Sequence, residues 1–151
     1  MKVTGRYPIY NIRYFIDTAS RAIIRQGYHL YCDIKDHPLY DLLRLGWCGH
    51  SADVRLFACT VPFYSQHIAP RYHLCNDYDG HPLETVFFDV VKQRMTIDPV
   101  IVRFKREPRF GGVEGSNIKA VSFSKNQNSP KARIKRFVGN AIRCLLPWFY
   151  F

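Results

Sequence analysis

Cysteine and histidine side chains gather in one window of the chain, between residues 48 and 81. The window holds three of the five cysteines and four of the six histidines. Two pairs in it have one residue between their donors, Cys48-Gly49-His50 and His73-Leu74-Cys75. Residues i and i+2 of an extended segment point to the same side, so each pair can offer two donors to one ion. Zinc in structural sites takes four sulfur and nitrogen ligands. The sequence therefore predicts a structural zinc site with Cys48, His50, His73 and Cys75 as ligands.

Two other interpretations of this window stay open. Cysteine is often a small buried hydrophobe, so these residues can belong to the core. Alternatively, a Cys–His hydrolase would use one cysteine as nucleophile and a nearby histidine as base, oriented by an acid. The residues for it would be Cys59 or Cys75, His67 or His73, and Asp77 or Asp79. No strong enzymatic motif is present, and we predict a protein that is not an enzyme.

Positive charge is concentrated in the last third of the chain. The 151 residues carry 22 Lys and Arg against 12 Asp and Glu, a formal net charge of +10. Residues 103–151 hold 11 of the basic side chains and only two acidic ones. A dense basic segment beside a near-neutral body predicts an anionic partner, and RNA is the partner we expect. The predicted RNA-contacting residues are Arg103, Lys105, Arg106, Arg109, Lys131, Arg133, Lys135, Arg136 and Arg143.

The clearest helix predicted from the sequence lies inside this basic segment. Ser129-Pro130 supplies an N-cap and a first-turn proline. Apolar residues follow at helical spacing, and they are Ile134, Phe137, Val138, Ala141, Ile142 and Leu145. Such a basic amphipathic helix, followed by the aromatic residues 148–151, also fits an anionic membrane surface or a host protein. A third interpretation is that its apolar side packs on the body of the protein.

The remaining elements predict an α+β fold with a small mixed sheet, two short helices and this basic C-terminal helix. Strand patterns cover 6–15, 28–34, 53–61, 84–91 and 100–105. Short helices are expected from Asp17 or Thr18 to Gln26, ended by Gly27, and over 39–45, ended by Gly46. The predicted organisation is a body over 1–106, a flexible linker over 107–129 with a short strand at 120–123, and a helix with an aromatic tail over 130–151.

The sequence also bears on location. No apolar run is long enough to span a bilayer, and the first residues do not show the apolar segment of a signal peptide. With an odd number of cysteines, a disulfide framework is not expected. We therefore predict a cytoplasmic or nuclear protein.

Taken together, these residues resemble a known family of viral proteins. The chain is similar to the first-open-reading-frame proteins of sobemoviruses. The similarity lies in the size of the chain, in the cluster Cys48, His50, Cys59, His73 and Cys75, and in the aromatic residues after Cys144. The resemblance implies suppression of host RNA silencing, support of virus movement, and zinc binding as in some family members. It thus implies a location in the host cell. We expect a non-enzymatic viral accessory protein that binds RNA, with a membrane or host-protein adaptor as the alternative.

Overall fold

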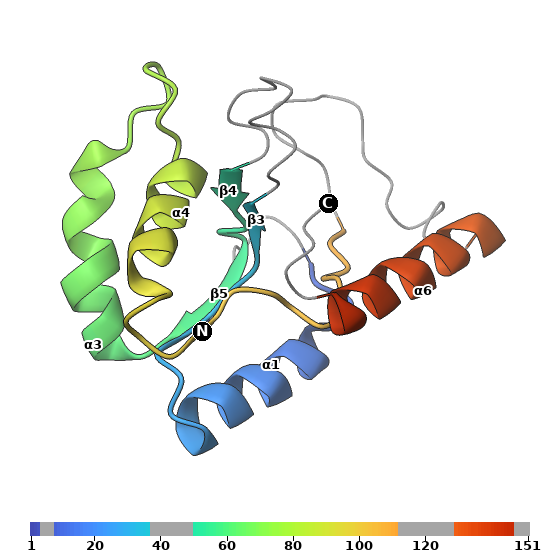
Figure 1. Ribbon diagram of the computed structural model, residues 1–151. Helices are drawn as coiled ribbons and strands as arrows, with labels where there is room; N and C mark the ends of the chain where they lie inside the picture. Colours follow the sequence, from blue (N-terminus) through green and yellow to red (C-terminus); the bar gives the residue numbers. More distant parts are fainter. Residues whose placement is uncertain (4–7, 37–49, 112–128, 147–151) are drawn as a thin grey trace.

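A four-stranded mixed sheet lies at the centre of the computed structural model, which describes residues 1–3, 8–36, 50–111 and 129–146 (Figure 1). The strand order is β1-β5-β2-β6. β5 pairs antiparallel with β1 and β2, and β6 runs parallel to β2. A separate antiparallel pair joins β3 to β4. The strands are β1 (Lys2–Val3), β2 (Leu30–Tyr31), β3 (Ile34–Asp36), β4 (His50–Ala52), β5 (Leu56–Cys59) and β6 (Val100–Ile101).

Helices cover both faces of this sheet. The helical elements are α1 (Ile12–Ser20), η1 (Arg21–Arg25), α3 (Val61–Phe63), η3 (Tyr64–Ile68), η4 (Ala69–Leu74), α4 (Leu83–Arg94) and α6 (Pro130–Leu145). α3 and α4 lie on one side of the sheet, and α1 and α6 lie on the other (Figure 1). The predicted α+β class, the mixed sheet and the C-terminal helix are confirmed.

Side chains that alternate along the strands build two hydrophobic cores. Leu30 and Phe57 face α4 and pack with Phe87, Phe88 and Val91. Their strand neighbours point the opposite way, because successive side chains of a strand leave opposite faces. Tyr31, Leu56 and Ala58 accordingly pack with Phe15, Ala19 and Phe104 in the core under α1. The two central strands, β2 and β5, are thus buried on both faces, whereas β1 at the edge is exposed.

The N-terminal region differs from the prediction. A strand was expected over 6–15, whereas α1 begins at Ile12, and Ile9 makes only an isolated bridge with Phe110. The reason is the spacing of Ile12, Phe15, Ala19 and Ala22, which places these residues on one helical face against the core. The predicted stop is confirmed, since Gly27 adopts a φ of 73° after η1.

α4 is the second correction, because residues 84–91 were expected to form a strand. Val and Phe favour strands, but Phe87 and Val91 are four residues apart and bury the same helical face. Glu84 in the first turn and Lys92 and Arg94 in the last turn complement the helix dipole. Tertiary burial of this face outweighs the β propensity of its residues.

Helical turns over residues 61–74 were not anticipated from the sequence. Thr60 caps α3 by accepting a hydrogen bond from the Phe63 N–H at 3.3 Å, and a proline lies in the first turn. The expected strands over 28–34, 53–61 and 100–105 correspond to β2, the start of β3, β5 and β6. The expected helix over 39–45 and strand over 120–123 lie outside the described residues, as does most of the predicted linker.

The C-terminal helix begins and ends where its sequence predicts. Ser129 is the N-cap, and its Oγ accepts a hydrogen bond from the Ala132 N–H at 3.2 Å. The helix ends at Leu145, two residues before Pro147. The packing of α6 on the body determines what the basic segment can contact.

Candidate nucleic-acid interface

A buried carboxylate, Asp33, anchors α6 to the body. Asp33 follows β2, and its alternation with Cys32 directs its side chain to the α1 side of the sheet. The Arg143 Nη1 donates to both carboxylate oxygens, at 2.8 and 3.1 Å, and also to the Phe104 carbonyl at 3.3 Å. The Phe104 N–H donates to Oδ1 at 3.1 Å, and Arg103 Nη1 lies 3.8 Å from it.

Burial also shifts the pKa of the Asp33 carboxyl. Removal from water raises the pKa of Asp33, and the ion pairs with Arg143 and Arg103 act in the opposite direction. A buried carboxylate requires such partners, because an unpaired charge inside a protein is strongly unfavourable. Two of the predicted RNA-contacting residues, Arg103 and Arg143, are therefore directed to Asp33 rather than to the surface.

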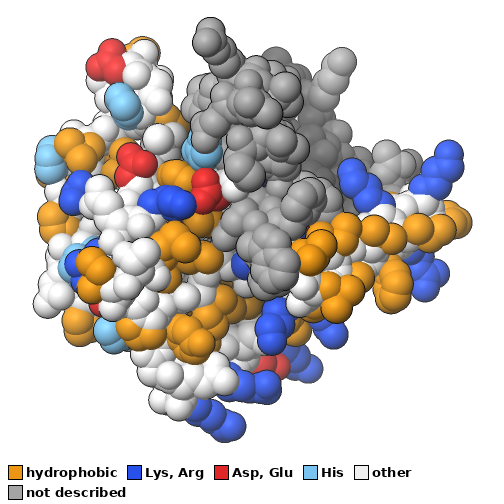
Figure 2. Space-filling model, viewed as in Figure 1, with side chains coloured by type: hydrophobic (Ala, Val, Ile, Leu, Met, Phe, Trp, Pro, Cys, Tyr) orange, Lys and Arg blue, Asp and Glu red, His pale blue; other side chains and the backbone are white. Residues whose placement is uncertain are grey.

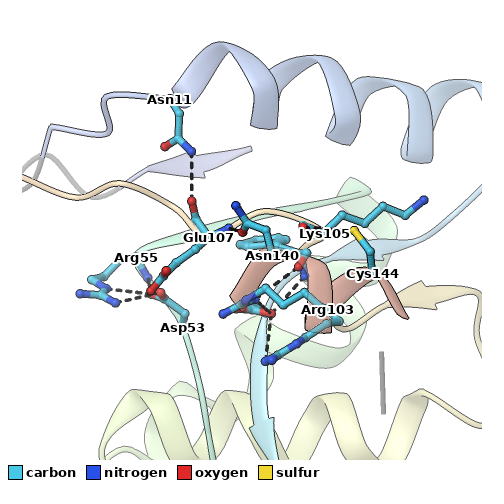
Figure 3. A network of polar contacts seen from close by, with 11 residues as sticks. Asn11, Asp53, Arg55, Arg103, Lys105, Glu107, Asn140 and Cys144 are labelled. Carbon is cyan, nitrogen blue, oxygen red and sulfur yellow. Dashed lines mark hydrogen bonds and ion pairs between the residues drawn. The ribbon is translucent and has the colours of Figure 1, made fainter. Parts of the chain in front are cut away.

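The side-chain amides of Asn140 and Asn11 hold the segment that follows β6, at Glu107 and Arg109. Asn140 of α6 accepts a hydrogen bond from the Glu107 N–H at 3.0 Å (Figure 3). On the opposite side, Asn11 donates to the Glu107 carbonyl at 3.0 Å and accepts from the Arg109 N–H at 2.8 Å. The segment is thus held between the start of α1 and the last turns of α6.

The Lys and Arg side chains of this fixed segment differ in exposure. Lys105 and Arg106 are exposed, whereas Arg109 is half-buried. The Arg106 guanidinium lies over the Tyr14 ring, 4.6 Å from its centroid. Burial raises the pKa of Tyr14, so its phenol is neutral beside this cation.

On α6, the exposed predicted residues are Lys131, Arg133 and Lys135, and Arg136 is half-buried. Arg13, Arg21 and Arg25 on α1 and η1 are exposed as well, and sequence reasoning did not select them. Their spacing of eight and four residues was a signal that they share one helical face. It was missed because the first of them fell inside an expected strand. Figure 2 shows Lys and Arg side chains along the lower edge of the molecule and on both sides of α6.

Charge is unevenly divided between the two sides of the sheet. Residues 9–28, 103–109 and 129–146, on the α1 side, hold twelve Lys and Arg and two acidic residues. Residues 61–98, on the α4 side, hold three Lys and Arg and five acidic residues. We call the exposed cations on the α1 side the basic face, which consists of Arg13, Arg21, Arg25, Lys105, Arg106, Lys131, Arg133 and Lys135. A polyanion would meet this face first.

The predicted zinc ligands are described only in part. Cys48 lies outside the described residues. His50 Nδ1 lies 3.1 Å from Asp36 Oδ1, and His73 is in the last turn of η4, close to Cys75. Across the described ranges, no three His, Cys, Asp or Glu side chains form a group able to hold a metal ion. The four-residue ligand set stays a prediction.

Cys59, one of the two candidate nucleophiles of a Cys–His hydrolase, does not have an activated thiol. Burial raises the pKa of this thiol, whereas a nucleophilic cysteine needs a lowered pKa. The ring of His67, a candidate base, packs edge-on against Phe63, with 5.1 Å between ring centroids. Asp77 and Asp79 belong to the turn that ends at Gly80, whose φ is 74°.

Among the helices that the structure describes, none combines the length and the apolar character needed to cross a bilayer. Comparisons of the chain with models of protein families, with curated proteins and with solved structures found no match.

Proposed function

We propose that this chain is a non-enzymatic RNA-binding protein that contacts phosphates through its basic face. The observation that carries the proposal is the collection of eight exposed Lys and Arg side chains that form the basic face on the α1 side of the sheet. Each cation placed against a phosphate releases condensed counterions, which favours binding without base recognition. Lys105 and Arg106 connect the cations of α1 with those of α6 along this side.

The length of α6 is compatible with contact along an RNA duplex. α6 has 16 residues and is therefore about 24 Å long at 1.5 Å per residue. Proteins recognise double-stranded RNA largely through its backbone shape, phosphates and 2′-hydroxyls. A chain that covers short duplexes in this way would keep them from other proteins. Such sequestration is the route we propose to suppression of host RNA silencing, and RNA binding would equally serve a movement factor in the host cytoplasm or nucleus.

The test is a salt titration of binding to a short RNA duplex, followed by fluorescence anisotropy. The variant carries Lys131→Gln, Arg133→Gln and Lys135→Gln. We expect the slope of log affinity against log salt to fall by about 2–3. A matched control, Lys2→Gln with Arg71→Gln and Lys92→Gln, removes the same charge away from the basic face.

Three results would contradict the proposal. They are an affinity that does not depend on salt, no measurable affinity, and equal losses in the two triple variants. The last result would mean that net charge alone, and not its position on the basic face, governs binding.

Zinc binding is a separate proposal that rests on the sequence window. Carboxylates commonly orient histidine ligands, as Asp36 orients the His50 ring. Native mass spectrometry of protein purified without chelator tests it. One zinc per chain that is lost on His73→Ala with Cys75→Ala supports the predicted set, and a metal-free folded protein removes it.

A further inference from the structure

The amphipathic helix α6 packs with its polar edge towards the protein. Polar contacts with the body come from Arg143 and Asn140, at Asp33, Phe104 and Glu107, and from Cys144, whose Sγ lies 3.6 Å from the Lys105 carbonyl oxygen. Amphipathic helices on globular proteins ordinarily bury the apolar face and expose the polar one. No residue of α6 is fully buried. Ala141 and Ile142 of its apolar face are half-buried, whereas the other four apolar residues are exposed.

The apolar face consequently points outwards. Ile134, Phe137, Val138 and Leu145, which we call the apolar stripe, occupy positions i, i+3, i+4 and i+11 of one helical face. Their exposed fractions are 65%, 76%, 48% and 74%. Figure 2 shows hydrophobic side chains in a continuous line along α6. A contiguous exposed line of large aliphatic and aromatic groups indicates an interaction surface.

The charges beside the stripe indicate what would cover it. On the helical wheel, Lys131 and Lys135 flank the stripe on one side, and Arg133 flanks it on the other. Residues 130–145 contain no acidic side chain. A covering partner must therefore be apolar in the centre and anionic at the edges. A second copy of this helix would bring like charges together and is disfavoured.

We propose that α6 binds in the plane of an anionic lipid surface, with the apolar stripe inserted between headgroups. Lys131, Lys135 and Arg133 lie at the level of the phosphates, because long basic side chains extend their charged ends to the polar region. With 16 residues, α6 is too short to span the hydrocarbon core, and this in-plane orientation does not require spanning. The body, attached through Arg143 on the opposite edge, stays on the aqueous side.

The experiment measures sedimentation of the full chain with vesicles of phosphatidylcholine, with or without phosphatidylserine. The full chain should sediment with the anionic vesicles only. Ile134→Ser with Phe137→Ser should weaken this binding about tenfold or more, because two inserted side chains are lost. The control, Ile24→Ser with Ile97→Ser, replaces two side chains that are 80% and 68% exposed away from α6. It should bind as the unmodified chain does.

Each alternative has its own signature. Failure to sediment with anionic vesicles, or equal binding by the stripe variant and the control, overturns the proposal. So does a chain that is dimeric by analytical ultracentrifugation and becomes monomeric with the stripe substitutions, since a second copy would then cover the stripe. RNA affinity of the stripe variant is measured in parallel. It should be unchanged, because both substituted groups are uncharged, and this separates failure here from failure of the RNA-binding proposal.

Discussion

α4 and α6 are both amphipathic helices, and they use their apolar faces in opposite ways. α4 buries Phe87 and Val91 against the sheet, and its charged residues lie at its ends and surface. α6 buries no residue and is attached through Arg143 and Asn140. The apolar residues of one helix therefore support the core, and those of the other leave a surface for a partner.

This difference separates stability from function along the chain. On the α4 side, the helix covers the sheet face and their aromatic residues pack together. The ring centroids of Phe57 and Phe87, for example, are 4.8 Å apart. The α6 side combines a buried ion pair with exposed cations and an exposed apolar stripe. Substitutions on α4 should act on folding, whereas most substitutions on α6 should act on binding.

The largest expected effect contrasts two phenylalanines. Phe87→Ala in α4 removes a side chain that is 2% exposed and should lower the free energy of unfolding by about 3–5 kcal/mol. Phe137→Ala in α6 removes one that is 76% exposed and should change it by less than about 0.5 kcal/mol. Urea denaturation followed by circular dichroism measures both. Similar losses in the two variants would show that the apolar face of α6 is packed in solution.

An intermediate effect is expected at the anchor of α6. Arg143→Met keeps the aliphatic part of the side chain but leaves Asp33 with Arg103 and the Phe104 N–H as partners. We expect a loss of about 2 kcal/mol, because a buried charged group loses its closest hydrogen-bond donor.

Arg133→Met is the matched control on the exposed edge of the same helix, and it should be near neutral. Urea denaturation again supplies the measurement. An Arg143→Met variant as stable as this control would mean that α6 is held by other contacts.

The smallest expected effect is a pH dependence that comes from Asp33. Burial raises the pKa of this carboxyl in the folded state, so the folded state binds the proton more tightly than the unfolded state. The resulting stabilisation is fully present below the unfolded pKa, near 3.9, and is lost as the pH rises through the folded pKa.

Unfolding of the unmodified chain is compared with that of Asp33→Asn, which does not titrate at this position. The stability advantage of the unmodified chain should shrink as the pH rises from about 4. An advantage that grows with pH would show that Arg143 and Arg103 outweigh burial. The folded-state pKa of Asp33 would then lie below that of an unpaired carboxylate, so the α6 side would hold this acid more firmly ionised.

How much the sequence predicts depends on whether the decisive signal is local. α6 was predicted with its cap and its end, because Ser129-Pro130 and the apolar spacing are contained within the helix itself. α4 was assigned to a strand, because its Val and Phe residues favour strands and only packing against the sheet makes the helical face decisive. Thr60, which caps α3, was a local signal that went unused.

The candidate interface shows the same division. Charge composition selects Lys105, Arg106 and Lys131, which are exposed, since most basic side chains remain in solvent. It selects Arg103 and Arg143 equally, although both are directed to a buried acid. Their partner, Asp33, is distant in sequence and has no local mark that distinguishes it. The outward orientation of the apolar stripe is likewise a property of tertiary packing.

The separation of Asp33 from Arg143 has a consequence during synthesis. The two residues are 110 positions apart, so a ribosome that adds 5–20 residues per second makes the carboxylate roughly 5–20 s before its partner. Until then, of its described partners on the α1 side of the sheet, Asp33 has only Arg103 and the Phe104 N–H. Among the described elements, α6 is therefore the last to be made and the last that can pack against the body.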